Sequence, residues 1–449
     1  MSPRGVPGSP VAASVALPLG LALAALLLST PHPAVAADAA HADAALARAA
    51  RQIVGADQGV YVEAADGHVL LAQAAARPVH PASVSKVPTT LALLRRLGPA
   101  YRFVTTFSVT GHLDGHQLDG QLQVQGGPNP DPALVDEDAL LVAQRLNRLG
   151  IDSIRGPLRV QGELIFDWQN DPQGERLARA LSGQTPAAAW NAVLALRGGA
   201  APLGMTAPPS VRWLSPAVTA DAATVPHAGT DLVTTATTGV RPVSVTGATV
   251  TDVLTFRSEP LLPLLKSLDD YSNNIVAPLA QAAGGAAAVE RLARASVPEP
   301  MQAEITLGDG AGTDPRNRLS PRAAVKLLRA LEQQLASTGH ALPDVLPVSG
   351  VDAGTLHDRL NGPDAAGHVV GKTGTFGDYG ASALIGAIRT RDHGEVYFAI
   401  LNHGVPVPEA RRRQDAFVRV LLAHLPSLPW QHVADAQAAV ARVQLVSAP

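Results

Sequence analysis

Short apolar runs bounded by turn residues stand near both ends of the chain, and each run predicts a β-strand. The first two are residues 60–62 and 68–71, separated by an Asp66-Gly67 turn. Three more strands are expected within residues 368–401, and Asp392-His393-Gly394 turns the chain before the last of them. Strands from the two ends would complete one antiparallel sheet.

Between these strands, apolar side chains recur every three or four positions, as in amphipathic helices. A leucine-rich helix follows Pro81-Ala82-Ser83 and is expected to end near Gly98. Because such helices would cover the antiparallel sheet, the expected fold class is α+β. The other expected helices are residues 40–53, 136–149, 261–268, 276–283, 286–295, 321–335 and 409–425.

The stretch from residue 103 to residue 254 has a different composition, rich in Thr, Val and Gly-based turns. Strands are expected at residues 103–109, 117–124 and 158–166. We therefore expect a large inserted β-rich domain at 103–254, between two parts of one helix-covered domain at 37–102 and 255–449. This arrangement would place the segment around Ser83 next to residues far along the chain.

The N-terminus has the pattern of a secretory signal peptide, expected at residues 1–36. Arg4 precedes a mostly apolar run, residues 11–28, and Ala34-Val35-Ala36 matches a small-residue cleavage site. Cleavage after Ala36 would release an exported protein into the periplasm or cell envelope, with no integral membrane anchor. An uncleaved anchor is the alternative, because the apolar run could nearly cross a bilayer.

The composition excludes several kinds of partner and functional site. The 449 residues carry 35 basic and 38 acidic side chains and no long Lys/Arg run, so no nucleic-acid partner is expected. The absence of Cys excludes disulfides, zinc thiolate sites and a Cys nucleophile. His112 and His116 flank an Asp114-Gly115 turn, which favours a surface hairpin, and no metal site is expected.

Four of the basic residues are lysines, and two of these four belong to candidate catalytic motifs. Ser83-Val84-Ser85-Lys86 is an S-x-x-K at the start of a helix, where one turn brings the Ser83 hydroxyl within reach of the Lys86 amine. A serine needs a base to become a nucleophile, and a Lys held neutral by burial can serve. A surface Lys after a helix cap is the competing interpretation.

Two further segments are candidate motifs of the same active site. Ser272-Asn273-Asn274 is an S-x-N that could equally be an ordinary loop. Lys372-Thr373-Gly374-Thr375 follows a strand-like run. Gly374 would let a substrate approach the strand edge, and the Thr hydroxyls could hold a carboxylate. Together and in this order, the motifs are those of serine acyl-transferases that act on penicillin and on D-Ala-D-Ala peptides.

On these motifs the chain resembles the low-molecular-mass class C penicillin-binding proteins, which are serine D-Ala-D-Ala carboxypeptidases/endopeptidases of the Dac B type. The resemblance implies a penicillin-binding protein/β-lactamase-like domain with an insertion between the first two motifs. Ala311 replaces the usual Ser, and Pro88 stands where an aliphatic residue is usual and is expected to disturb the helix. Further matching segments are Asp131-Pro132-Ala133-Leu134, Asp309-Gly310-Ala311-Gly312 and Val351-Asp352-Ala353-Gly354-Thr355-Leu356.

The resemblance also implies a role for each motif residue. Ser83 attacks the penultimate D-Ala carbonyl, Lys86 takes its proton, and Ser272, with Lys372, returns a proton to the leaving amine. Asn274 positions Lys86 and the substrate amide. Thr373, Gly374 and Thr375 bind substrate, with the Ser83 and Thr375 N–H groups as the oxyanion hole. The implied partners are peptidoglycan peptides ending in D-Ala-D-Ala and, covalently, β-lactam antibiotics, with no metal or other cofactor.

Two other functions remain open at this point. A serine β-lactamase shares the three motifs, but the E-x-x-L-N loop of class A enzymes is absent from the sequence. A catalytically silent cell-wall binding protein of the same fold is the second alternative. Arg411-Arg412-Arg413, in the closing helix, is interpreted as a solvated basic face.

Overall fold

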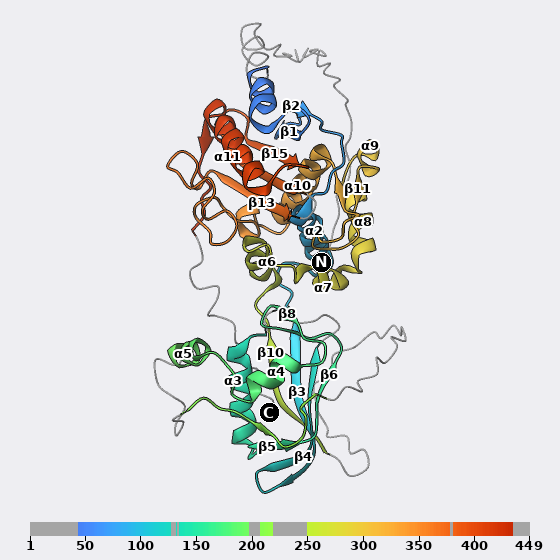
Figure 1. Ribbon diagram of the computed structural model, residues 1–449, viewed down its shortest axis with the longest axis vertical. Coiled ribbons are helices and arrows are strands. Elements are labelled where there is room, and N and C mark those ends of the chain that lie inside the picture. Colours follow the sequence, from blue (N-terminus) through green and yellow to red (C-terminus); the bar gives the residue numbers. More distant parts are fainter. Residues whose placement is uncertain are drawn as a thin grey trace, which may run out of the picture. The chain divides into compact units, whose positions relative to one another are not determined.

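The computed structural model in Figure 1 describes residues 44–126, 132, 134–196, 207–218, 249–377 and 380–433. The expected signal peptide lies outside the described residues, as do Asp131 and Ala133 of the D-P-A-L segment. Within these described ranges, no helix combines the length and the apolar character that crossing a bilayer requires.

Strands from both ends of the chain form one antiparallel sheet, as the sequence predicts. Its order is β13-β14-β15-β1-β2, and a short sixth strand, β16, pairs with β14. Edge strand β13 pairs with β14 on one side and, on the other, makes an isolated bridge through Val370 to Val348. The strands are β1 (Gly59–Ala64), β2 (Val69–Gln73), β13 (Val369–Phe376), β14 (Ala381–Thr390), β15 (Glu395–Asn402) and β16 (Ser427–Leu428).

Helices cover both faces of this main sheet (Figure 1). Tyr61 and Ile385 point to the face that packs with α10 and α2, whereas Val62 and Leu384 point to the face that packs with α11. Neighbouring residues thus alternate between two apolar layers, which explains why these strands are apolar runs. The helices are α2 (Lys86–Leu97), α6 (Leu261–Asp270), α7 (Val276–Leu279), α8 (Ala286–Ala295), α9 (Glu299–Gln302), α10 (Pro321–Ala336) and α11 (Val407–His424).

Shorter elements complete this part of the chain. The helix predicted at residues 276–283 is divided into α7 and a 3₁₀ segment. Near the N-terminus, residues 44–49 are α-helical and a π-helical turn follows them. These elements are η1 (Ala50–Val54), η2 (Ala82–Ser85), η3 (Ala280–Ala283), η4 (Leu342–Asp344), β11 (Ile305–Thr306) and β12 (Arg318–Leu319).

The Thr/Val-rich middle of the chain forms a second sheet with its own apolar core. The strand order is β10-β3-β4-β5-β9, and β6 also pairs with β4. Phe107, Leu122 and Leu140 belong to the core between this sheet and its helices. The elements are β3 (Val104–Asp114), β4 (Gln117–Gly126), α3 (Asp136–Arg148), β5 (Ser153–Arg155), β6 (Leu158–Gln161), β7 (Ile165–Phe166), β8 (Gln169–Asn170), α4 (Glu175–Leu181), α5 (Ala187–Leu196), β9 (Arg212–Trp213) and β10 (Thr249–Arg257).

Two details of this second sheet differ from the sequence prediction. The strand expected at residues 158–166 is interrupted, because Gly162 turns the chain with φ +84° after β6 ends. Strand β10 continues to Arg257, past the boundary expected at residue 254. The interruption arises from pairing that a local pattern does not record, because β6 pairs with β4 whereas β7 pairs with β8.

Candidate active site

Ser83 and Lys86 lie at a change of helix type. Ser83 belongs to the 3₁₀ turn η2, and Lys86 is the first residue of α2. In 3₁₀ geometry residues i and i+3 eclipse, which places the Lys86 amine over the Ser83 hydroxyl. Pro88 was expected to disturb the helix, because an α-helical turn at residues 84–88 would press the Pro88 ring against the Val84 carbonyl. The 3₁₀ turn avoids that contact, and α2 continues unbroken to Leu97.

The Lys86 amine is fully buried and makes three polar contacts. Lys86 Nζ lies 2.7 Å from Ser83 Oγ, 3.0 Å from Asn274 Oδ1 and 2.8 Å from the Ala311 carbonyl oxygen. The amide and carbonyl oxygens can only accept hydrogen bonds. A neutral amine therefore donates its two N–H groups to them and keeps its lone pair for the Ser83 hydroxyl proton.

The electrostatics favour this neutral form. Burial, followed by the positive charge of Lys372, lowers the pKa of Lys86 to about 7. A second lysine pKa is also depressed, since burial lowers that of Lys372 to about 8 while Asp269 and Asp270 oppose the shift. The two positive charges oppose each other, and the acceptor contacts of Lys86 fit that amine for the neutral form. The site then holds one neutral and one protonated lysine near neutral pH.

Lys372 joins the second motif to the third. Its Nζ donates to Ser272 Oγ at 2.9 Å and to the Thr373 carbonyl oxygen at 3.1 Å, and its side chain is fully buried. Ser272 lies in the turn after α6 with φ +56°, a conformation that costs energy for any residue but Gly. This turn directs the Ser272 hydroxyl to Lys372 and the Asn274 amide to Lys86.

Gly374 brings the third motif against the first. A Cβ atom at this position would lie 2.6 Å from the Pro81 carbonyl oxygen and 3.2 Å from Ser83 N, so only Gly allows β13 to approach so closely. Thr373 is buried and Thr375 is exposed at the same strand. The structure thus brings all eight predicted site residues together: Ser83, Lys86, Ser272, Asn274, Lys372, Thr373, Gly374 and Thr375.

The D-G-A-G segment supplies backbone to this site. Asp309 accepts hydrogen bonds from Gly312 N and Asn317 Nδ2, both at 2.8 Å, and so holds the turn that presents the Ala311 carbonyl to Lys86. The replacement of Ser by Ala at position 311 does not remove this contact, because the backbone makes it. Gly312 is required, since a Cβ there would lie 1.9 Å from the Ala82 carbonyl oxygen.

The V-D-A-G-T-L segment supports the turn that carries Ser272. A Cβ on Gly354 would lie 2.2 Å from the Asp270 carbonyl oxygen, which also accepts from Thr355 N at 2.8 Å. Asp352 ion-pairs with Lys266 of α6 and contacts His432 Nε2 at 2.8 Å. These contacts hold the C-terminal end of α6 and the turn after it, which carries Ser272.

Sequence reasoning missed three residues around the site. Asp269 is fully buried, its Oδ2 accepts from Thr90 Oγ1 at 3.0 Å, and its charge acts on both lysines. His80 accepts from Ala82 N at 3.1 Å and stacks on Phe376, with ring centroids 4.5 Å apart. Arg411 Nη2 donates to Thr375 Oγ1 at 2.8 Å. Asp269 and His80 stand close to motif residues in sequence, which was the available signal, whereas nothing local indicated Arg411.

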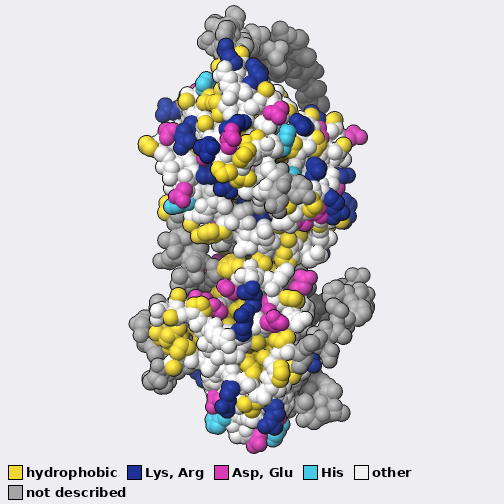
Figure 2. All heavy atoms as spheres, in the orientation of Figure 1, with side chains coloured by type: hydrophobic (Ala, Val, Ile, Leu, Met, Phe, Trp, Pro, Cys, Tyr) yellow, Lys and Arg dark blue, Asp and Glu magenta, His cyan; other side chains and the backbone are white. Residues whose placement is uncertain are grey.

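Other polar features of the described residues lie apart from these motifs. Basic and acidic side chains are interspersed over the described residues on the face in Figure 2. The strands around Asp114-Gly115 form the expected hairpin, and His116 pairs with Asp152 at 3.1 Å. No group of three or more His, Cys, Asp or Glu side chains suited to a metal ion occurs within the described ranges.

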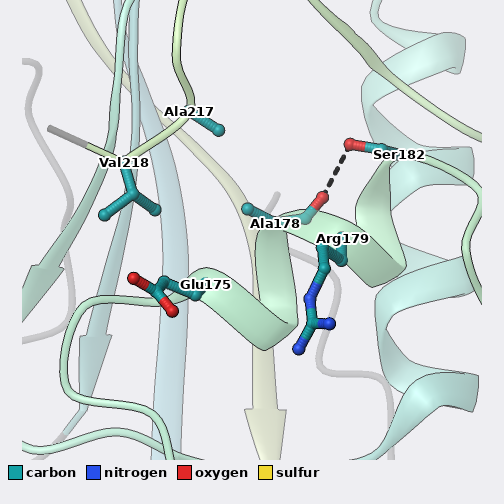
Figure 3. Close-up of a pocket in the computed structure, with 6 residues that line it drawn as sticks. All are labelled: Glu175, Ala178, Arg179, Ser182, Ala217 and Val218. Atoms are coloured by element: carbon teal, nitrogen blue, oxygen red, sulfur yellow. Dashed lines mark hydrogen bonds between the residues drawn. The ribbon is translucent and has the colours of Figure 1, made fainter.

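A pocket of about 440 Å³ lies in the second-sheet region, where the Ser182 hydroxyl is used within its own helix and donates to the Ala178 carbonyl oxygen (Figure 3). The pocket contains none of the motif residues, so it belongs to a different part of the chain from the candidate active site. Its lining residues are Glu175, Ala178, Arg179, Ser182, Ala217 and Val218.

Comparisons with known proteins show the family of the chain. The family model D-Ala-D-Ala carboxypeptidase 3 (S13) matches residues 39–176 and 191–424. Carboxypeptidase DacB of Mycolicibacterium smegmatis is 28% identical over 426 residues, which are 88% of this chain and 85% of that protein.

Solved structures show the same fold at lower identity. The penicillin G-acylated Bd3459 predatory endopeptidase of Bdellovibrio bacteriovorus aligns with a TM-score of 0.63 and 22% identity, covering 84% of this chain and 95% of that one. Penicillin-binding protein 4 (dacB) of Haemophilus influenzae aligns with a TM-score of 0.54 and 16% identity, covering 84% and 99%. The expected α+β penicillin-binding protein/β-lactamase-like fold is confirmed. The chain belongs to the D-Ala-D-Ala carboxypeptidase 3 (S13) family and is a serine-type carboxypeptidase of that family.

Proposed function

We propose that the chain is exported and trims peptidoglycan stem peptides through an acyl-enzyme on Ser83. The observation that carries the proposal is the set of contacts at the Lys86 amine. Two acceptor oxygens occupy its N–H groups, and its remaining position faces Ser83 Oγ at 2.7 Å. This is the geometry of a neutral base that activates a hydroxyl.

The reaction follows from these positions. Ser83 Oγ bonds to the carbonyl carbon of the penultimate D-Ala while its proton passes to Lys86 Nζ. The carbonyl oxygen becomes an oxyanion, which the N–H groups of Ser83 and Thr375 stabilise. The C–N bond then breaks as the leaving amine receives a proton through Ser272, whose hydroxyl contacts the Lys372 amine at 2.9 Å. Water then attacks the ester carbonyl, and Ser83 Oγ leaves with the proton held by Lys86. One water proton returns to Lys372 through Ser272, the other passes to solvent, and the shortened peptide departs as a carboxylate.

A β-lactam enters the same sequence with a different leaving group. Its amide is cyclic, so the amine stays attached after the C–N bond breaks and the acyl-enzyme persists. We therefore propose covalent binding of β-lactam antibiotics at Ser83. If penicillin were instead released rapidly as the hydrolysed product, the β-lactamase alternative would be favoured.

Digestion of purified muropeptides, followed by mass spectrometry, tests the function and measures carboxypeptidase against endopeptidase activity. Loss of one alanine from a pentapeptide means carboxypeptidase activity, and conversion of crosslinked dimers into monomers means endopeptidase activity. We expect the first, with the second as an additional activity. Muropeptides that remain unchanged with the wild-type protein would contradict the proposal.

Export needs a separate test. The support is the N-terminal pattern of Arg4, an apolar run and Ala34-Val35-Ala36. We expect the protein recovered from the periplasm or cell envelope to begin at Ala37. A mature protein that retains residues 1–36 would contradict cleavage.

A further inference from the structure

Arg411 reaches the candidate active site from a helix far along the chain. It lies on α11, and its Nη2 donates to Thr375 Oγ1 at 2.8 Å. Thr375 follows Gly374 on β13, and Gly374 is the residue that packs against Ser83 N. The guanidinium is thus placed one strand residue beyond the contact between β13 and the nucleophile segment.

The positive charge of Arg411 has no acidic partner among the residues that the structure describes. Asp415 pairs with Arg359 at 2.6 Å, and Glu409 pairs with Arg413. Burial of part of its surface, followed by the nearby charge of Arg359, lowers the pKa of Arg411 below its usual value. Asp415 partly opposes this shift, and an anion bound beside Arg411 would oppose it further.

The substrate supplies such an anion at the matching distance. When its scissile carbonyl is at Ser83, the terminal D-Ala extends one residue further and ends in a carboxylate. The scissile carbonyl oxygen lies at the N–H groups of Ser83 and Thr375, and one residue of extended chain spans about 3.3 Å, so the carboxylate of the terminal D-Ala is within reach of the Thr375 hydroxyl and of Arg411. Lys372 is less available, because it is fully buried and bonded to Ser272 and to the Thr373 carbonyl oxygen.

We propose that Arg411, together with the Thr375 hydroxyl, binds the free carboxylate that follows the scissile bond, a proposal that rests on the serine carboxypeptidase function above. Arg411 thereby selects substrates whose leaving residue is anionic. The basic triplet was predicted to be a solvated face. Arg411 and Arg412 are indeed exposed, but Arg411 also has a polar partner in the site.

Two acyl-D-Ala thioesters that differ only in the leaving group provide the test. One leaving group is thioglycolate, which ends in a carboxylate, and the other is its carboxamide. The kcat/KM for the first divided by that for the second measures carboxylate recognition. Arg411→Ala, Arg411→Lys and the neighbouring control Arg412→Ala are compared with the wild-type protein.

We expect Arg411→Ala to reduce this ratio about 10- to 100-fold, as the loss of a charge-assisted hydrogen bond would. Arg411→Lys should restore part of the ratio, and Arg412→Ala should leave it within about twofold of wild type. An Arg411→Ala variant that slows both thioesters equally would overturn the proposal, because the residue would then be merely structural. Wild-type protein that is acylated by neither thioester would instead contradict the proposed function itself.

Discussion

Lys86 Nζ and Asn274 Oδ1 lie 3.0 Å apart, although 188 positions separate the two residues in the chain. The contact orients the amine as well as bringing the motifs together. With Asn274 and the Ala311 carbonyl as acceptors, the Lys86 lone pair has one direction left, towards Ser83. The catalytic role predicted for Lys86 depends on this orientation and on the loss of its proton.

Lys86→Arg should abolish acylation although the positive charge is kept, because Arg does not lose its proton at any pH that the fold survives. We expect the rate of labelling by fluorescent penicillin to fall below about 1% of wild type, the scale of a lost general base. Thermal unfolding of the variant shows whether the fold is retained. Normal labelling by a folded Lys86→Arg protein would show that Lys86 is not the base.

The acylation rate should depend on pH through the two lysines. A pKa of about 7 for Lys86 means that acylation falls roughly tenfold per pH unit below about 7, where the base is protonated. Above about 8, Lys372 loses its proton, and the rate should fall again if its charge is required. The rate constant for penicillin acylation between pH 5 and 10 measures both limbs. A rate that does not change between pH 5 and 7 would contradict the assignment.

The depressed pKa also affects stability, with a definite sign. Lys86 titrates near 7 in the folded protein and near 10.5 in the unfolded chain, so the unfolded chain binds more protons between these values. The contribution of this group to the free energy of unfolding therefore rises with pH across that range. Comparison of wild type with Lys86→Met by denaturant unfolding isolates this contribution, and the stability difference between the two proteins should change with pH in this direction.

Asp269→Asn should move the acid limb of the activity profile to lower pH. Burial raises the pKa of Asp269, but its carboxylate, where ionised, raises the pKa of both Lys86 and Lys372. Asn keeps an acceptor for Thr90 Oγ1 and removes the charge. A profile identical to that of wild type would mean that Asp269 is neutral in the working enzyme.

Gly374→Ala should separate β13 from the Ser83 segment, because the new Cβ would lie 2.6 Å from the Pro81 carbonyl oxygen. We expect about a 10²-fold loss in acylation rate, the scale of a disturbed oxyanion donor, with the fold retained. Gly377→Ala is the matched control, since a Cβ at position 377 would have no atom of the described residues, chain neighbours aside, within 4 Å. Equal acylation rates for the two variants would contradict the importance of this close approach.

Lys372→Ala should weaken acylation while the fold survives. The substitution removes the positive charge and the hydrogen bond to Ser272 Oγ, and we expect a loss of roughly 10²-fold or more in the rate. Stopped-flow measurement with penicillin gives the rate directly, and circular dichroism checks the fold. Unchanged kinetics would remove Lys372 from the mechanism.

The sequence predicted the main sheet well, because β1, β14 and β15 are apolar runs between clear turns. The three motifs were also recognisable, since each places its chemistry within three or four neighbouring residues. The contacts of Ala311 and Arg411 could not be predicted in this way. A backbone carbonyl has no residue-type signal, and Arg411 meets Thr375 only because α11 packs on the sheet. The 3₁₀ turn at Ser83 also has no local signal of this kind.

The most direct test of the account is the site of penicillin attachment. Wild-type protein is incubated with benzylpenicillin, digested and analysed by mass spectrometry, beside Ser83→Ala and the control Ser85→Ala. Ser85 is a suitable control because its buried Oγ has no hydrogen-bond partner among the described residues. The account predicts one adduct on Ser83 in wild type and in Ser85→Ala, and none in Ser83→Ala. An adduct on another residue, or one that persists in Ser83→Ala, would contradict it.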